Sequence, residues 1–572
     1  MPFRSLCLFL AVSIHTASGV FAAPPPREPV AVAYLSSIDG VLDDIDYIVS
    51  AGGQPQLSQM VQGFVANLNN LEGIDRTKPV GVYAFFPVDL GGGKKDPDII
   101  GFIPVTDIEA LKKTAHLSNV LSLEATDKPN RYEFKTPEKT FAVLIDQGHA
   151  FITENAQLLD NPLPAPMALT EVLGKQYDIV IQLRREGVPP FLIEMVKFGL
   201  LSESDKEMKK LKEKNQPEDL LKVRGIEMGR SALVTVMGEA RSVWVGLRVS
   251  RETRTAVIDA KLAFTDSGKV AKALTQMVES PASLAKSAGA DAPAAVHFHV
   301  AMPEEAKKLS AELGRLARQK KDPVASIPEP QRTSVNALID VVQQTVNEGE
   351  YEVLLQFTGE PQTGMTLVAG VHVADGKKLS ESVMKLLPEA RNSDKVGAVT
   401  LDAGEARGVH FARIDGKADE EVHAADDKSA AEKPGEKAAT GAKKETKVEL
   451  FYGGQPSLYV GTEASTLWLV VGDGDALKDF ASLAEEPARN TDRTAKAAFG
   501  KAHLHLSDWL GLLSLSQDQK THDFSEAARV ATKDPDRDAI RFVVQPVADG
   551  LSLSLTFDEA YLNLIGASIG KK

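Results

Sequence analysis

Cysteine is almost absent from this chain. Its 572 residues include a single cysteine, Cys7, which lies in an N-terminal segment that we expect to be removed. The mature chain would then have neither a disulfide nor thiol chemistry, so its stability must come from packing, which a chain of this length can supply. Because Cys7 lies at the start of an apolar run and not at a cleavage boundary, the sequence also argues against a lipid-anchored lipoprotein.

Long apolar runs are missing as well. No stretch reaches the roughly 18 uninterrupted apolar residues of a membrane span. At the N-terminus Arg4 precedes the short apolar run Leu6–Ile14, and the small residues Val20 and Ala22 fit the rule for signal-peptide cleavage after Ala22. We therefore expect a signal peptide over residues 1–22, a Pro-rich linker over 23–29, and export of a soluble protein to the periplasm or the medium.

Positive charge is in short supply. Lys and Arg number 65 against 79 Asp and Glu, which gives a formal net charge of −14. Phosphate binding draws on clustered Lys and Arg, so nucleic acid is not an expected partner. One Lys-rich segment, residues 206–214, is interleaved with Glu and Asp, a pattern typical of a solvated helix face.

What the sequence does contain is one pattern written four times: two apolar strands joined by a turn, then an Asp that opens an amphipathic helix. An Asp at a helix start can accept hydrogen bonds from the free backbone N–H groups, so we expect four helix caps. The predicted hairpins and their Asp residues are Val80–Phe86 with Ile99–Pro104 and Asp107, Val243–Val249 with Thr255–Phe264 and Asp266, Tyr351–Phe357 with Met365–Val373 and Asp375, and Ile540–Val547 with Leu551–Phe557 and Asp558.

Each copy also opens with a strand that leads into a helix, and copies one and three carry a second hairpin. The predicted fold is α+β (mixed α/β), with antiparallel sheets covered by helices and two pseudo-duplicated halves. Between the hairpins of copy three, Lys, Glu, Asp, Ala and Gly replace large apolar residues, which predicts disorder. The boundaries are 30–175 for repeat 1, 176–291 for repeat 2, 292–490 for repeat 3 with a disordered insertion at 416–446, and 491–572 for repeat 4.

Familiar catalytic motifs fail in their context. Residues Gly566–Gly570 spell G-x-S-x-G, but a hydrolase elbow needs a following helix and later acid and His partners. Gly91–Lys95 lacks the Ser or Thr of a phosphate loop and lies between two predicted strands. Asp473-Gly474-Asp475 lacks most of an EF-hand loop and reads as a helix cap. No cofactor is expected, and catalytic residues stay unknown.

Histidine forms the one constellation that suggests chemistry. His297 and His299 alternate on one predicted strand, and His503 and His505 alternate on the corresponding strand of repeat 4. Residues two apart on a strand share a face, so each pair could bind zinc or copper, with a third ligand from His372, His410 or a carboxylate. The alternative is surface or half-buried imidazoles without a metal.

The whole layout resembles that of uncharacterised exported α/β-repeat proteins of planctomycete-type bacteria, which carry domains of unknown function. The resemblance rests on the leader, the strand–helix openings, the Asp-led helices and the closing unit Asp538–Ile569. It implies export and a repeat architecture and brings no active site with it.

The leading hypothesis is a non-catalytic exported protein that binds an unknown protein or envelope component through grooves between its repeats. One alternative is a secreted hydrolase with a site between the two halves, which would show perturbed carboxylates or histidines converging in one cleft. A further alternative is a metal binder through the strand histidines. Whether the chain is an enzyme stays open, and the sequence favours that it is not.

Overall fold

The structure is a computed structural model, and it divides the chain into two compact units. The first unit comprises Met1–Val41 and Gly63–Pro189, and the second comprises Leu42–Gln62 and Pro190–Lys572. The predicted signal peptide, most of the linker and nearly all of the insertion lie outside the described residues. The described residues are 27–86, 97–116, 121–214, 216–266, 268–280, 282–289, 291–320, 324, 327–329, 331–360, 364–417, 451–483, 498–514 and 518–569.

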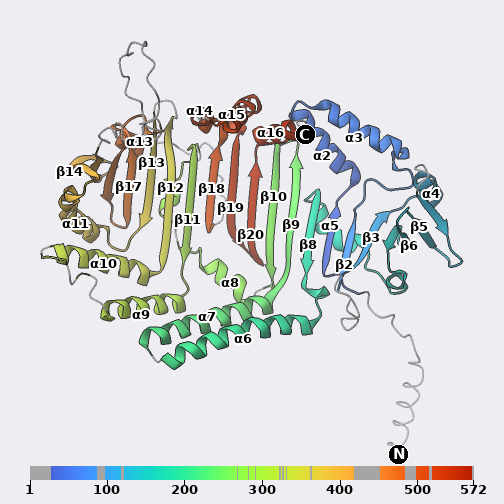
Figure 1. Ribbon diagram of the computed structural model, residues 1–572, viewed down its shortest axis with the longest axis horizontal. Coiled ribbons are helices and arrows are strands. Elements are labelled where there is room, and N and C mark those ends of the chain that lie inside the picture. Colours follow the sequence, from blue (N-terminus) through green and yellow to red (C-terminus); the bar gives the residue numbers. More distant parts are fainter. Residues whose placement is uncertain are drawn as a thin grey trace, which may run out of the picture. The chain divides into compact units, whose positions relative to one another are not determined.

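The first unit is built on eight antiparallel strands (Figure 1). Their order across the sheet is β8-β1-β2-β3-β7-β6-β5-β4, so the strands nearest the middle come from both hairpins. The strands are β1 (Ala31–Leu35), β2 (Val80–Phe85), β3 (Asp98–Pro104), β4 (Ser122–Ala125), β5 (Arg131–Lys135), β6 (Thr140–Asp146), β7 (His149–Thr153) and β8 (Ile179–Arg184).

The second unit carries twelve strands, again all antiparallel (Figure 1). Their order is β9-β10-β20-β19-β18-β11-β12-β13-β17-β16-β15-β14. The strands are β9 (Ala240–Ser250), β10 (Thr255–Phe264), β11 (Ala294–Ala301), β12 (Glu350–Glu360), β13 (Gly364–His372), β14 (Val396–Ala406), β15 (Val409–Gly416), β16 (Ser457–Thr462), β17 (Thr466–Gly472), β18 (Gly500–His505), β19 (Ala539–Val547) and β20 (Gly550–Phe557).

A helix follows each hairpin that the sequence pattern indicated, and two helices instead of the one expected follow each opening strand. None of the described helices is long and apolar enough to cross a bilayer. The α-helices are α2 (Ile38–Ala51), α3 (Pro55–Asn67), α4 (Ile108–His116), α5 (Pro166–Gly174), α6 (Pro190–Lys214), α7 (Pro217–Glu239), α8 (Lys269–Gln276), α9 (Glu304–Lys320), α10 (Gln331–Glu348), α11 (Gly376–Leu386), α13 (Ala476–Ser482), α14 (Leu506–Ser514), α15 (Gln519–Ala531) and α16 (Glu559–Ile569).

The core of the first unit lies on one face of its sheet. Tyr83, Phe102 and Val180 are fully buried there, and the Tyr34 hydroxyl donates to the Thr170 carbonyl oxygen of α5 at 3.2 Å. Alternation along a strand puts every second residue on the opposite face. That opposite face is also apolar over β8, β1, β2 and β3, and it lines a cavity.

One core cluster of the second unit surrounds Trp468. The indole packs edge-on against Phe480 of α13, and Phe480 packs in the same way against Phe411 of β15. All three rings are buried. The Arg407 guanidinium lies 5.7 Å from the Trp468 ring centre and 5.2 Å from that of Phe480, so a charge closes this core at the β14–β15 turn.

The predicted α+β class is confirmed, with antiparallel strands and helices in alternation. The four hairpins that lead into helices are present, and each opening strand is present as β1, β8, β11 or β18. The element order from β1 to β7 also recurs from β11 to β17, and the order from β8 to α8 recurs from β18 to α16, with short 3₁₀ helices set aside. That the halves arose by duplication, and that the repeats end at the predicted boundaries, stay predictions.

Two of the four predicted helix caps are confirmed. The Asp107 carboxylate accepts from the Glu109 N–H at 2.8 Å and the Ala110 N–H at 3.2 Å. The Asp375 carboxylate accepts from the Lys378 N–H at 2.8 Å. In both cases the charge lies at the positive end of the helix dipole, as the pattern indicated.

The other two predicted caps are wrong because other partners compete for the same positions. Glu239, at the end of α7, accepts from the first N–H groups of α8, at 3.0 Å from Lys269 and 2.9 Å from Val270, while Asp266 pairs with Arg241. Asp558 is buried and accepts from the Ala539 N–H at 3.1 Å and from the Arg541 guanidinium. The charge-assisted hydrogen bond with Arg541 is stronger than a bond to a backbone N–H, so the Asp558 carboxylate does not cap the helix.

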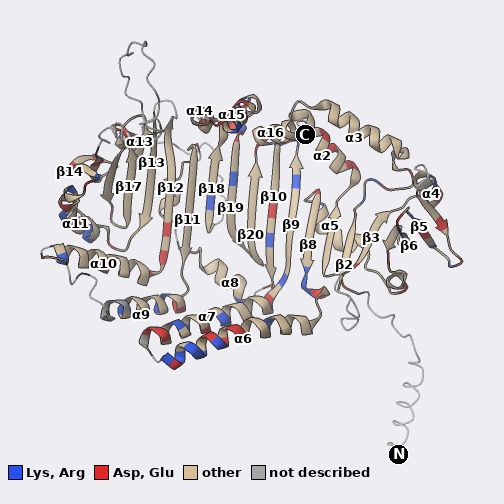
Figure 2. Ribbon diagram, in the orientation of Figure 1, with Lys and Arg blue, Asp and Glu red and all other residues tan. Residues whose placement is uncertain are grey.

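The Lys-rich segment lies on α6, as an exposed helix face would. Figure 2 shows acidic and basic residues interleaved along α6. Lys212 lies 3.3 Å from Glu227 of α7, and Asp205 pairs with Arg230 of the same helix. Pairs of this kind are solvated and add little to stability, so this segment is no concentrated basic patch.

Candidate functional site

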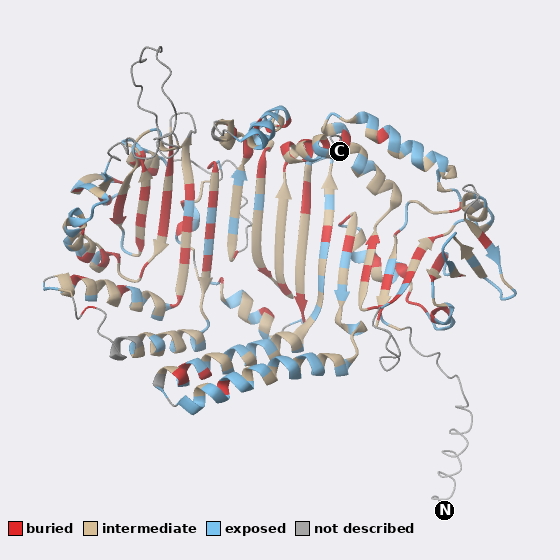
Figure 3. Ribbon diagram, viewed as in Figure 1, coloured by how far each residue is buried: buried red, intermediate tan, exposed pale blue. Residues whose placement is uncertain are grey.

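The two histidine pairs of the sequence lie on adjacent strands. β11 and β18 pair antiparallel, with Ala295 opposite His503 and His297 opposite Lys501. Because directly opposite residues share a face and residues two apart on one strand do too, His297, His299 and His503 all lie on one face of the second unit's sheet. Figure 3 shows the alternation of buried and exposed residues along β11 that results.

His297 belongs to a buried polar cluster centred on Glu352 of β12. Its Nε2 lies 2.9 Å from Glu352 Oε1, and both side chains are buried. Glu352 also accepts from the Ser283 N–H at 2.9 Å, the Ser283 hydroxyl at 2.7 Å and the Leu284 N–H at 2.8 Å. This carboxylate therefore ties the segment before β11 to the sheet.

The pKa of Glu352 reflects these contacts. Burial raises the pKa, but the hydrogen bonds from His297, Ser283 and Leu284 outweigh burial and lower the pKa to about 2. The carboxylate is ionised at neutral pH, so it acts as a fixed acceptor and not as an acid.

His299 and His372 lie beside this cluster and are less satisfied. His299 is directly opposite Glu352 in the β11–β12 register, and the β12–β13 register continues to His372 on the same face. His299 Nδ1 and His372 Nε2 are buried without a hydrogen bond among the described residues. A carboxylate oxygen of Glu348 lies 3.8 Å from His372 Nε2. Burial lowers the pKa of His299, so this ring is held neutral.

The second pair has different partners. His503 Nε2 lies 3.0 Å from the Ala292 carbonyl oxygen, and burial together with the nearby His505 lowers the pKa of His503. His505 Nδ1 lies 2.8 Å from Asp538 Oδ1, and Asp538, which is fully buried, also accepts from the Ser507 N–H at 2.6 Å. Burial raises the pKa of Asp538, but hydrogen bonds from His505 and Ser507 lower it below its usual value.

These contacts bear on whether the four histidines could hold a metal ion. Among the described residues no group of three or more His, Cys, Asp or Glu is placed to hold a metal ion. His297, His503 and His505 each use one ring nitrogen on a protein acceptor, an arrangement that metal-binding histidines also have. His410, the other suggested ligand, is exposed and lies 3.5 Å from Glu405. Metal binding by His297, His299, His503 and His505 stays a prediction.

The remaining sequence motifs are structural or lie outside the described residues. Ser568 of the G-x-S-x-G spelling is inside α16, where its hydroxyl donates to the Ile565 carbonyl oxygen at 2.7 Å, so it is no nucleophile elbow. Asp473 accepts from the Asp475 N–H at 2.9 Å, and Asp475, not Asp473, is the cap residue of α13. Gly91–Lys95 falls outside the described residues.

The described part of the chain also contains cavities that a ligand could enter. A cavity of about 870 Å³ lies on the sheet of the first unit, and one of about 720 Å³ lies among helices of the second. A smaller polar cavity of about 290 Å³ lies beside Arg254, Arg537 and Glu559. None of these three cavities is lined by the four predicted metal ligands.

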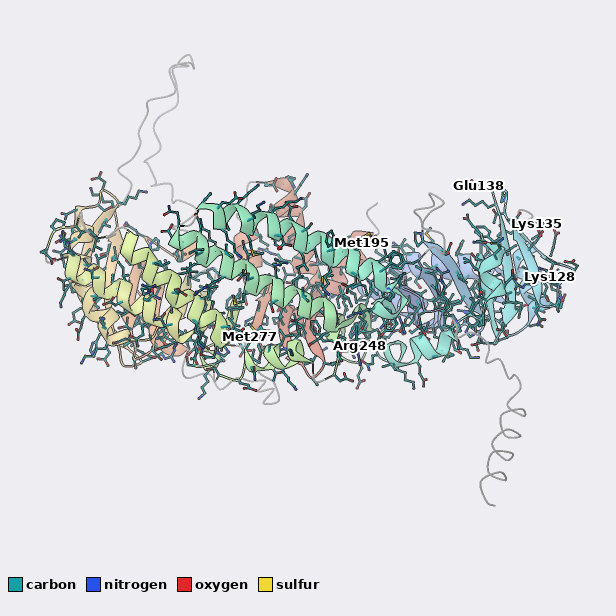
Figure 4. The ribbon with its side chains drawn as sticks, turned by 90° about the horizontal axis from the view of Figure 1, so that it is seen from below. Lys128, Lys135, Glu138, Met195, Arg248 and Met277 are labelled. Atoms are coloured by element: carbon teal, nitrogen blue, oxygen red, sulfur yellow. The ribbon has the colours of Figure 1, made fainter. Side chains whose placement is uncertain are left out.

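The cavity of the second unit is lined by α7, α8, Pro303 and α9. Met228, Val270 and Leu309 supply apolar wall, and a 2.7 Å ion pair between Arg224 of α7 and Glu312 of α9 spans its rim. Figure 4 shows this helical side of the unit from below, with α6 and α7 running side by side. Such a groove suits an apolar partner with polar flanks.

Sequence reasoning missed the cavity of the first unit, although a signal for it exists. The strands AVAYL and VGVYAF are apolar on both faces, a composition typical of strands covered on both sides, and IVIQLR is apolar on the face that carries Ile179, Ile181 and Leu183. Here α5 covers one face, and the other face lines the cavity. Strands with two apolar faces in an antiparallel sheet could therefore have been predicted to line a cavity.

Comparison with known proteins adds no relative. No family model, no curated protein and no solved structure matches the chain. The resemblance to exported proteins of planctomycete-type bacteria stays a prediction.

Proposed function

We propose that this chain is a non-catalytic exported protein that binds a partner or an envelope component in grooves between its repeats. The observation that carries the proposal is where the two large cavities lie. The cavity of the first unit joins residues of repeat 1 to Ile179–Ile181 of repeat 2, and that of the second unit joins α7 and α8 of repeat 2 to α9 of repeat 3. Ligand sites favour such junctions.

The chemistry of these cavities supports binding over catalysis. The wall of the first cavity is mostly Val, Ile, Leu and Ala, whereas that of the second mixes Val, Leu and Ala with charged side chains, and one ion pair borders each cavity. A hydrolase would gather histidine and carboxylates with shifted pKa values in one cleft. The two pairs of a histidine with a carboxylate, His297 with Glu352 and His505 with Asp538, do not line any of the three cavities.

The test is native mass spectrometry of mature protein purified after export, together with titration by an anilinonaphthalene sulfonate dye that fluoresces in apolar sites. We expect a non-covalent adduct or saturable dye binding that falls when a cavity is filled. Gly101→Leu fills the first cavity and Ala273→Trp the second. The matched controls are Gly63→Leu, where an added Cβ would meet nothing within 4 Å, and Val530→Trp, which replaces an exposed side chain.

The proposal fails if wild type carries no adduct and binds no dye, or if all four variants behave alike. Far-UV circular dichroism and the urea midpoint of each variant must match wild type, because a loosened core also binds this dye.

A further inference from the structure

The cavity of the first unit has a floor made by one row of residues across five strands. In register these are Ile181 of β8, Ala33 of β1, Val82 of β2, Gly101 of β3 and Ile152 of β7. Directly opposite residues share a face, so this row forms a continuous apolar strip across the sheet.

The strip is hollow because small residues alternate with large ones. Ala33 and Gly101 lie between Ile181, Val82 and Ile152. A Cβ built on Gly101 would meet nothing closer than the Ile152 carbonyl oxygen, at 3.7 Å, so the backbone does not require glycine there. The missing side chain leaves open volume, and the cavity reaches about 870 Å³. Pockets for small ligands have about 300 to 1,000 Å³.

Large apolar side chains surround this hollow without being covered. Val82 is 43% exposed, and Ile99 and Ile181 are each 54% exposed, whereas Tyr83, Phe102 and Val180 on the packed face are fully buried. Exposure of apolar surface to water is unfavourable in proportion to its area. A contiguous patch of this kind marks a binding surface.

The charges that line the cavity are already paired. Asp98 lies 3.3 Å from Arg27, and Glu154 lies 2.6 Å from Lys139. No net charge therefore faces the floor from these two carboxylates, and electrostatics favours an uncharged group over the apolar strip.

The backbone of the floor narrows the class of occupant. β1, β2 and β3 each pair with strands on both sides, so they offer no free N–H or C=O row to an added strand. A peptide lying on Val82 and Ile181 would gain no backbone hydrogen bonds from β1, β2 or β3. A flat sheet face of a second copy would leave the hollow unfilled, which close packing disfavours.

We propose that this cavity binds a linear hydrocarbon chain, the acyl chain of a fatty acid or a single-chain lipid. The inference rests on the proposed binding function and names its ligand class. An acyl chain has no polar group along its length, can follow the strip from Ile181 to Ile152, and leaves its headgroup in water.

The experiment is calorimetric titration of mature protein with decanoate, laurate and myristate below their micelle concentrations, and with a lysophospholipid of the same chain lengths. Each added buried methylene should tighten binding about four-fold. Binding by the fatty acids alone or by the lysophospholipids as well distinguishes the two sources of the chain, and either supports the inference.

Gly101→Leu should weaken myristate binding at least ten-fold, and Ile181→Lys, which changes an exposed side chain, should do the same without a folding risk in the core. Gly63→Leu should bind as wild type does. Affinity that ignores chain length, or equal binding by all three variants, overturns the inference.

The outcome also separates this inference from the function beneath it. If acyl chains do not bind but a native adduct or dye is lost on Gly101→Leu, the ligand class is wrong and the groove function stands. If neither binds in either cavity, both proposals fall.

Discussion

At the scale of single residues, Glu352 is the carboxylate on which the buried polar cluster of the second unit depends. It accepts from His297, from Ser283 twice and from Leu284, all within 2.9 Å. Removing Glu352 would leave its buried donors without an acceptor. The loss in the free energy of unfolding would therefore exceed the net contribution of the hydrogen bonds themselves.

Glu352→Ala should therefore lower the free energy of unfolding by about 3 to 5 kcal/mol. The matched control is Glu405→Ala, which removes the exposed carboxylate 3.5 Å from His410 and should change stability by less than about 0.5 kcal/mol. Urea unfolding followed by circular dichroism measures both. Equal losses from the two substitutions would contradict the assignment of Glu352 as a structural anchor.

Acid should remove the contribution of Glu352 in a defined window. Its pKa falls from 4.5 to about 2 on folding, so the folded state holds fewer protons, and the stability is present above pH 4.5 and lost as the pH falls toward 2. We expect the gap in urea midpoint between wild type and Glu352→Gln to shrink over this range. A gap that widens in acid would contradict the lowered pKa of Glu352.

His299 and His503 have pKa values lowered from 6.5, so a first loss of stability should already begin below pH 6.5.

At the scale of elements, two hairpin turns take the same backbone shape with different side chains. Gln147 before Gly148 and Arg407 before Gly408 both have positive φ, of 53° and 55°. Asn tolerates this left-handed region better than other residues with a Cβ, and Asn-Gly is the favoured pair in such turns.

Gln147→Asn should raise the melting temperature, by an amount equivalent to up to roughly 1 kcal/mol. Arg407→Asn should not, because the Arg407 guanidinium that it removes stacks on Trp468 and Phe480. Differential scanning calorimetry of the two variants decides this, and stabilisation by Arg407→Asn would show that the cation–π contacts contribute nothing.

The cap of α8 offers a second comparison between elements. Glu239→Ala should lower the urea midpoint more than Asp266→Ala does, since the carboxylate that accepts from Lys269 and Val270 belongs to Glu239. The reverse ranking would restore the cap that the sequence pattern predicted.

These caps show how far the sequence reaches. Alternating apolar residues and turns predicted β2, β3, β10 and β13 to within about a residue, because local spacing decides such strands. The strands β4, β5, β14 and β15 were not predicted, because charged or small residues interrupt the apolar pattern, as in SLEA of β4, RYEFK of β5 and VGAVTLDAGEA of β14. Neither Glu239 nor Glu352 could be predicted as an acceptor for backbone N–H groups, because the N–H groups that donate to them lie 30 and 69 residues away in sequence.

At the scale of the whole molecule, we expect the stability of the mature chain not to depend on disulfides. The only cysteine, Cys7, lies in the segment predicted to be removed. Thermal unfolding of the mature protein should give the same midpoint with and without dithiothreitol. A shift would mean that cleavage had failed or that Cys7 forms an intermolecular disulfide.

The hairpin β19–β20 lies inside the second unit's sheet, between β18 and β10, although it is formed by residues 539–557. β10 is translated nearly 300 residues before its neighbour β20, so the middle of this sheet cannot close until the last hairpin emerges. Contacts this distant in sequence make folding slow. Until then β10 and β18 expose unpaired edges that invite aggregation. A ribosome stalled before residue 539 would release a chain prone to aggregate, and an export machinery that keeps chains unfolded would suit this order of assembly.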